Sequence, residues 1–148
     1  MPKKKSLAEK IAEANTFLVF DIGLKRTGAA SGVALTKSAT PAGLIVVTNG
    51  RHDWAEVDQI INEWQPDVII TGDPKTSDPH LNKAINRFKS HIHRWHKCPI
   101  IDVNETLTSV AANESLHNRG LSQQRKTELR DQVAACLILE TYFNSLNN

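Results

Sequence analysis

Apolar and polar positions follow two different periods along this chain, and the change of period separates a strand-rich first part from a mixed second part. Residues 17–22 form a compact apolar run with one acid in it, which is typical of a buried strand. Residues 28–35 are small and β-permissive, and 44–48 are rich in β-branched side chains. Three strands joined by short turns predict an antiparallel meander.

In the second part, helical spacing alternates with short, continuous apolar runs. The expected elements are a helix at 54–64 behind an Asp53 cap, a strand at 68–71, a helix at 81–95, a strand at 99–103, a short helix at 108–118 and a final helix from 122 to about 146. Together with the meander, this order predicts an α/β fold with a five-stranded mixed sheet and helices on both faces.

The length of the chain bounds its organisation. A chain of 148 residues has room for one ordinary domain, which we assign to residues 16–148. Residues 1–15 begin with a short basic run and lack a strong apolar stripe, so a mobile N-terminal tail is expected there.

Charge and cysteine content exclude several classes of protein. The 18 basic and 16 acidic residues leave a net charge of +2, which by itself does not indicate a nucleic-acid-binding protein. The two cysteines have no paired spacing and are expected to be buried free thiols. No membrane span or signal peptide is evident, so a soluble, cytoplasmic protein without membrane contact is expected.

Three acids occur within or directly beside predicted apolar segments, where a buried carboxylate would be costly. Asp21 interrupts the first apolar strand, Glu105 follows the fifth, and Asp131 lies where the final helix changes from polar to apolar. Singly, each has an ordinary explanation: a turn cap, a loop acid, or a surface ion pair. Together they predict a carboxylate cluster, which would need divalent cations to offset its repulsion. Ligation by oxygen alone favours Mg²⁺ or Mn²⁺ over zinc.

Four short motifs resemble those of a known family, and the match covers nearly the whole chain from Phe17 to Phe143. They are Asp21-Ile-Gly23-Leu-Lys25-Arg26-Thr-Gly28, Gly72-Asp73-Pro74, Asn104-Glu105-Thr106-Leu107-Thr108, and the run from Asp131 to Leu139. In order and spacing they are similar to the bacterial pre-16S rRNA nucleases, also called Holliday junction resolvase-like proteins, of the ribonuclease H-like superfamily.

This resemblance implies a hydrolase in which Asp21, Glu105 and Asp131 are the catalytic, metal-binding acids, with Gly72 and Pro74 in a loop near the site. Its implied role is processing of the 5′ end of precursor 16S rRNA in ribosome biogenesis. The alternative nuclease role is resolution of branched DNA junctions.

Three residues depart from the family pattern. Leu24 stands where threonine is common, Thr106 where arginine usually follows the acidic residue, and Asp73 where an apolar residue is usual. The change at Thr106 removes a contact to phosphate, and Asp73 adds a negative charge to the loop. Both bear on efficiency and substrate choice.

A nuclease of this kind would use two cations, one activating water and the other stabilising the leaving oxygen. Lys25 and Arg26, just beyond the first strand, fit either flanking phosphates or solvated turn charges equally well. Lys83 and Arg87 belong to a stretch, 75–97, with a local balance of +5, which predicts a phosphate-binding track.

The same stretch holds four histidines, but a zinc site is not expected there. Residues two apart on a helix, such as His91 and His93, point to different faces, and no nearby cysteine or acid completes a set with His96. Trp54, Trp64 and Trp95 are expected to belong to the core.

Two other classes of function fit parts of the sequence. An Asp-x-Gly motif after a first strand also occurs in actin-like and sugar-kinase ATPases, but these need a second lobe. The second class is a non-catalytic RNA-binding factor in ribosome assembly. The departures from the family pattern at Asp73 and Thr106 are compatible with this class. The expected partners are nucleic acids, either structured RNA or branched DNA, and ribosomal precursor particles. The protein itself is expected to be a monomer or a homodimer.

Overall fold

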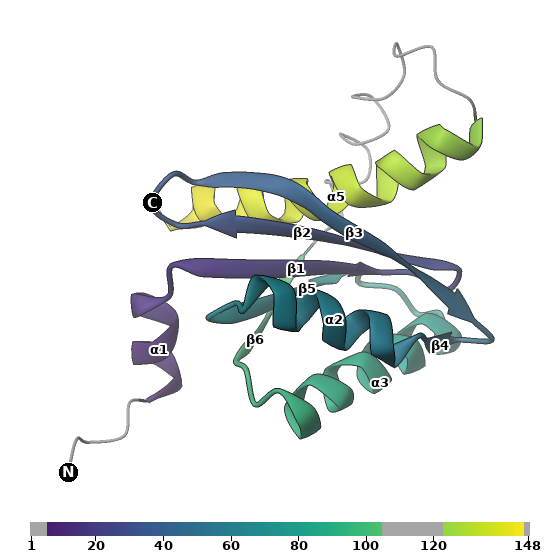
Figure 1. Cartoon of the computed structure of the whole chain (residues 1–148). Coiled ribbons are helices and arrows are strands. Elements are labelled where there is room, and N and C mark those ends of the chain that lie inside the picture. The colour runs from purple at the N-terminus through teal and green to yellow at the C-terminus, as the bar shows by residue number, and fades with distance from the viewer. Residues whose placement is uncertain (1–5, 105–122, 147–148) are drawn as a thin grey trace.

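The computed structural model describes residues 6–104 and 123–146, with the side chains of the last helix described from residue 132 onward. Figure 1 shows a single sheet with helices on its two sides. The helices are α1 (Leu7–Glu13), α2 (Trp54–Trp64), α3 (Pro79–Trp95) and α5 (Gln123–Ser145). The strands are β1 (Thr16–Ile22), β2 (Arg26–Val33), β3 (Ser38–Thr48), β4 (Arg51–His52), β5 (Val68–Asp73) and β6 (Ile100–Asn104).

The sheet is mixed, with the strand order β4-β3-β2-β1-β5-β6. β1, β2 and β3 pair antiparallel, as predicted, and β1 pairs parallel with β5, which pairs parallel with β6. The predicted α/β class and the mixed sheet are therefore confirmed.

The predicted strand number is wrong, because the sheet has six strands rather than five. The additional strand, β4, has only two residues and pairs with the end of β3. Asn49 and Gly50 form the turn between them, and both have positive φ angles, of 53° and 73°. Two residues are too few to show an alternation of apolar and polar positions, so the pattern on which the prediction rested could not reveal this strand.

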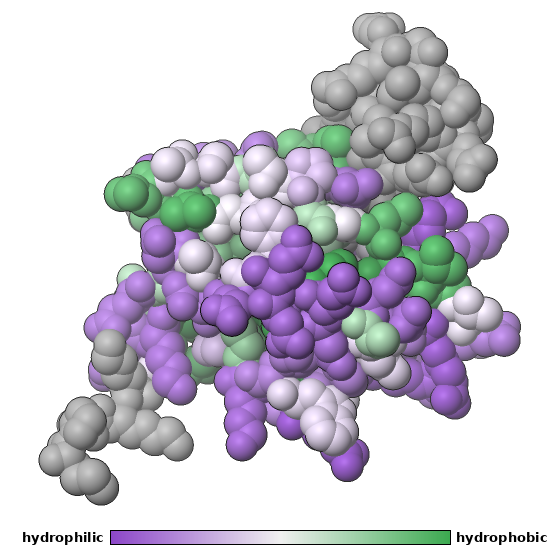
Figure 2. Space-filling view, in the orientation of Figure 1, coloured by the Kyte–Doolittle hydropathy of each residue, from purple (hydrophilic) through white to green (hydrophobic). Residues whose placement is uncertain are grey.

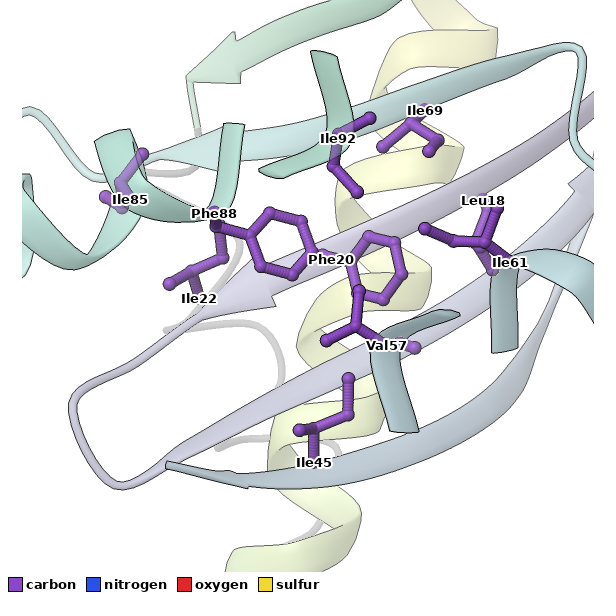
Figure 3. Close-up of a cluster of buried hydrophobic side chains, with 11 residues drawn as sticks. Leu18, Phe20, Ile22, Ile45, Val57, Ile61, Ile69, Ile85, Phe88 and Ile92 are labelled. Atoms are coloured by element: carbon purple, nitrogen blue, oxygen red, sulfur yellow. The ribbon is translucent and has the colours of Figure 1, made fainter. Parts of the chain in front are cut away.

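Two apolar cores lie on opposite faces of the sheet. Alternate residues of β1 supply both: Leu18 and Phe20 belong to the core under α2 and α3, whereas Phe17 and Val19 belong to the core under α5. Figure 3 shows the first core, in which Phe20 and Phe88 have ring centroids 4.7 Å apart. The prediction of helices on both faces is thus confirmed, and each face of the sheet packs against its helices through an apolar core of its own.

The segment expected to be a tail contains α1. Ser6 caps this helix, because its hydroxyl accepts a hydrogen bond from the backbone N–H of Glu9 at 3.1 Å. Ile11 is partly buried against the core under α5. The mobility of residues 1–15 stays a prediction.

The short helix expected at 108–118 lies outside the described residues. None of the helices in the described part of the chain has the length and apolar character needed to cross a bilayer.

Candidate functional site

The parallel strands β1, β5 and β6 end at one edge of the sheet, which we call the carboxyl edge. Ile22, Asp73 and Asn104 are their last residues, and Asp73 pairs in register with Asn104. In open α/β sheets, ligands commonly bind beyond this edge. A ligand-binding site is therefore expected at this edge.

Asp21 lies at the carboxyl edge, on the face of the sheet that α5 covers. It is the next-to-last residue of β1, half-buried, and opposite Gly28 of β2. Strand alternation puts it on the face of Phe17 and Val19, whose side chains pack in the core under α5. The structure therefore turns this acid away from α2 and α3 and toward the helix layer that contains position 131.

The other two predicted acids are only partly described. Glu105 directly follows Asn104 and lies outside the described residues. Position 131 belongs to α5, one helical turn before the fully buried Ala135, but its side chain is not among those described. The convergence of Asp21, Glu105 and Asp131 stays a prediction.

Two acids at or near the carboxyl edge face α3 instead. Asp73 accepts hydrogen bonds from the backbone N–H of Lys75 at 2.9 Å and from its ammonium at 3.1 Å, and these bonds lower the pKa of Asp73. The negative charge that this residue adds to the Gly72–Pro74 loop is therefore balanced locally.

Asp102 of β6 is the second acid, and no pattern in the sequence marks it as a site residue. It accepts hydrogen bonds from the Thr71 hydroxyl at 2.6 Å and the Lys89 ammonium at 2.9 Å. Burial opposes its ionisation, but the two hydrogen bonds and the positive charge of Lys89 together lower its pKa. With Gly72 and Asp73 it lines a small pocket of about 140 Å³.

A larger groove, of about 790 Å³, follows the outer side of α3. It is lined by Arg51, Trp54, Pro79, Asn82, Lys83, Asn86, Arg87, Ser90, His91, Arg94 and Trp95. Figure 2 shows hydrophilic residues gathered over the part of the molecule where α2 and α3 lie. Four of the lining residues are cationic, which suits a phosphate-bearing ligand.

The groove uses part of the basic stretch that the sequence singled out. Lys83 and Arg87 line it, whereas Lys75 and Lys89 form ion pairs with Asp73 and Asp102. Arg51 lines the groove from β4, the strand that the sequence pattern did not predict.

The β1–β2 turn brings Lys25 and Arg26 to the carboxyl edge. Lys25 is exposed, and its carbonyl accepts a hydrogen bond from the backbone N–H of Val47 at 2.9 Å. The turn is thereby tied to β3, and its cations lie near the end of the strand that bears Asp21.

The tryptophans are less buried than predicted. Trp54 packs partly against the core under α2 and α3, but Trp64 is 40% exposed and Trp95 63% exposed. The prediction that all three are core residues is wrong, because the last turns of α2 and α3 extend past the apolar stripe. The Arg94 guanidinium lies 5.1 Å from the Trp95 ring centroid, a cation–π contact beside the groove.

Asp58, His91 and His96 form a group of three candidate metal ligands. The expectation that no acid completes a set with the histidines is wrong, because α2 supplies Asp58 across the helix pair. His96 and His91 each donate a hydrogen bond to the same Asp58 oxygen, at 2.7 and 2.8 Å. Burial opposes the ionisation of Asp58, but the two hydrogen bonds and the charges of the histidines together lower its pKa.

In fold, the molecule is a Holliday junction resolvase-like α/β protein. The fowlpox virus resolvase, solved with its Holliday junction DNA substrate, matches 90% of this chain and 99% of its own with a TM-score of 0.59 at 16% identity. T. thermophilus RuvC, also solved with a Holliday junction, matches 90% of this chain and 96% of its own with a TM-score of 0.57 at 10% identity. Such distant identities establish the fold alone.

The chain belongs to the RuvX family, described as Holliday junction resolvase, whose sequence profile matches residues 15–145. A protein of Burkholderia vietnamiensis is 35% identical over 90% of this chain and 91% of its own, and one of Legionella pneumophila (strain Lens) is 36% identical over 85% and 93%. Both carry the name "Putative pre-16S rRNA nuclease". The family resemblance found in the sequence motifs is thereby confirmed, and the chain is of the RuvX nuclease type.

Proposed function

We propose that this protein is a metal-dependent nuclease that hydrolyses phosphodiester bonds, and that its substrate is the 5′ end of precursor 16S rRNA, within ribosomal precursor particles in the cytoplasm. Membership of a nuclease family whose relatives are named for pre-16S rRNA supports the activity and the substrate. The observation that carries the site is the position of Asp21, half-buried at the carboxyl edge on the face covered by α5.

The residues at this edge suit a divalent cation. Asp21 is the next-to-last residue of the mostly apolar β1, and position 131 is on the helix that covers the same face. Glu105 directly follows β6, which is two strands from β1 in the sheet. Three carboxylates offer only oxygen ligands, the set that Mg²⁺ and Mn²⁺ prefer. Such cations, when bound, activate water and stabilise the leaving oxygen of a phosphodiester. Asp21, Glu105 and Asp131 are the residues that would hold them.

The cationic residues provide the means of holding the substrate backbone. Lys25 lies in the β1–β2 turn at the carboxyl edge and Arg26 is the first residue of β2, whereas Lys83 and Arg87 line the groove along α3. The groove is on the opposite face of the sheet from Asp21, so a bound strand must cross the carboxyl edge to contact both. Gly72, expected in a loop, is the next-to-last residue of β5, and Pro74 is the first residue after this strand, so both lie at this edge.

The decisive experiment compares the protein with its Asp21→Asn variant on a 5′-extended 16S rRNA fragment in Mg²⁺ or Mn²⁺. The variant keeps the size of the side chain but loses its charge, so cleavage is expected to fall by a factor of about 100 or more, a loss of at least ~2.7 kcal/mol of transition-state stabilisation. Glu140→Gln, an exposed acid on α5, is the matched control and should cleave normally. Unchanged cleavage by the Asp21 variant would contradict the assignment.

Resolution of branched DNA is the second candidate, supported by the description of the matched family as Holliday junction resolvase. A four-way DNA junction assayed beside the RNA separates the two substrates. A resolvase should also be a two-fold dimer, because the junction presents two equivalent strands. Light scattering that shows only monomer would count against this candidate.

Binding without catalysis is the outcome that would indicate a different class of function. An assembly factor would hold the RNA through the cationic groove and show no metal-dependent cleavage. The same assay therefore distinguishes it, provided that RNA retention is measured in each reaction.

A further inference from the structure

A second group of metal-binding side chains lies on the opposite face of the sheet from Asp21. Asp58 comes from the middle of α2, His91 from the last part of α3, and His96 from the C-cap of α3. Figure 1 shows α2 and α3 on the same side of the sheet. The group bridges two helices that are separated in the sequence by β5.

The three ligand atoms already converge. Nε2 of His91 and Nε2 of His96 lie 2.8 and 2.7 Å from Oδ1 of Asp58, and all three atoms fall within 4.8 Å of one another. Both histidine side chains are only 12% exposed, whereas that of Asp58 is 37% exposed. The group is therefore largely screened by protein but has one side open to solvent.

Contacts outside the group restrain the ring of His91 and the backbone of His96. The ring of His91 stacks on that of Trp54, with centroids 4.3 Å apart and planes 12° from parallel. The backbone N–H of His96 donates to the Ile92 carbonyl at 2.9 Å, which ties this residue to the end of α3. Little side-chain freedom is left to lose when a ligand binds, a condition that favours affinity.

We propose that Asp58, His91 and His96 form a binding site for Zn²⁺, with water as the fourth ligand. Two imidazole nitrogens and one carboxylate oxygen are a donor set that zinc accepts in tetrahedral geometry. Each imidazole would give up its Nε2 proton and keep the one on Nδ1. Zinc bonds of roughly 2.0–2.2 Å require N···O separations of roughly 3.3 Å, so each present contact would open by about 0.5 Å.

This site is distinct from the proposed nuclease site in place and chemistry. α3 begins just after the carboxyl edge, and His91 is 12 residues from its start, or about 18 Å along the helix axis. The proposed nuclease ligands are all carboxylates, whereas two of these three are imidazoles. A zinc ion here would join α2 to α3 beside the cationic groove, which His91 also lines.

The test is a titration of the full-length, untagged, metal-stripped protein with Zn²⁺, followed by calorimetry and thermal denaturation. One equivalent should bind, and the midpoint of unfolding should rise. His96→Asn and Asp58→Asn should each weaken binding by tenfold or more and abolish the rise. The matched control is His93→Asn, an exposed histidine on the same helix, and Cys98→Ser excludes a thiol ligand; both should bind as the parent does.

X-ray absorption of the zinc-loaded parent protein gives a measurement that does not depend on the folding of a variant. It should show two imidazoles and no sulfur around the metal. Absence of zinc binding by the parent, sulfur ligation, or undiminished binding by a folded His96→Asn would overturn the proposal. Asp21→Asn should still bind zinc, so failure of the nuclease assignment and failure of this site are separately visible.

Discussion

His52 is a buried histidine whose protonation is controlled by its surroundings. Its side chain is 5% exposed, Nε2 lies 2.6 Å from the Thr27 hydroxyl, and Nδ1 has no hydrogen-bond partner among the described residues. Its ring lies against those of Trp54 and Phe88. Burial, with a smaller contribution from the charge of His91, lowers the pKa of His52 to about 4.

This shift predicts a loss of stability in mild acid. The unfolded chain protonates His52 near pH 6.5, whereas the folded chain resists protonation down to about pH 4, so the unfolded state binds more protons between these values. The contribution of His52 to the free energy of unfolding should therefore fall as the pH drops from 6.5 to 4, by at most about 1.4 kcal/mol per pH unit.

Urea denaturation at several pH values measures this effect. His52→Gln should show a shallower decline of the unfolding free energy between pH 6.5 and 4, because glutamine does not titrate. His80→Gln, an exposed histidine at the start of α3, should leave the decline unchanged. Equal slopes for the parent and His52→Gln would show that another group is responsible.

At the level of elements, the groove is a joint product of β4, α2 and α3. The density of cations in residues 75–97 pointed to a phosphate track, and Lys83, Arg87 and Arg94 do line the groove. The ion pair of Lys89 could not be predicted in the same way, because its partner Asp102 lies on β6, which is placed by its pairing with β5.

The groove predicts a specific dependence of nucleic-acid binding on salt. Removing one phosphate-contacting cation, as in Arg51→Gln or Arg87→Gln, should reduce the magnitude of the slope of log K against log salt by about 1. Lys37→Gln, in the β2–β3 turn at the other end of the sheet, is the charge-matched control. Filter binding across a salt series measures the slopes, and a change in the Lys37 variant as large as in the others would argue against a defined track.

At the scale of the whole molecule, the two cores share the central strands. β1 contributes Phe20 to one core and Phe17 to the other, so the loss of packing on one face is expected to weaken the strand on which both depend. Phe143 is 1% exposed and meets Phe17 edge to face at 5.3 Å. It is the best position at which to test this coupling.

Phe143→Ala should lower the free energy of unfolding by about 3–5 kcal/mol, through lost apolar contact and the cavity left behind. All three tryptophans lie on α2 and α3, across the sheet from this residue. If the molecule unfolds as one unit, tryptophan fluorescence and far-UV circular dichroism should shift together. Leu35→Ala, at an 86% exposed position, should change neither. A fluorescence transition left at its parental midpoint would mean that the two sides unfold separately.

Much of the architecture could be read from local patterns. The apolar run at β1 and the helical spacing in α2 and α3 directly reflect which side chains must leave water, so class, meander and two-sided helical cover were predictable. The four motifs between Asp21 and Leu139 identified the family, because each is a short run of adjacent residues and their order along the chain is specific. The apolar pattern does not predict β4, whose one local signal is the hairpin-type turn sequence Asn49-Gly50 before it.

By itself the sequence determined the fold class, the family and the candidacy of Asp21, all of which depend on local patterns and on their order along the chain. Only the tertiary structure decided that Asp58 contacts His91 and His96, and that Asp102 forms an ion pair with Lys89. It also decided that the groove and Asp21 lie on opposite faces of the sheet. The physical reason is that these contacts join separate elements. Their geometry depends on strand register and helix packing, which no local period of the sequence encodes.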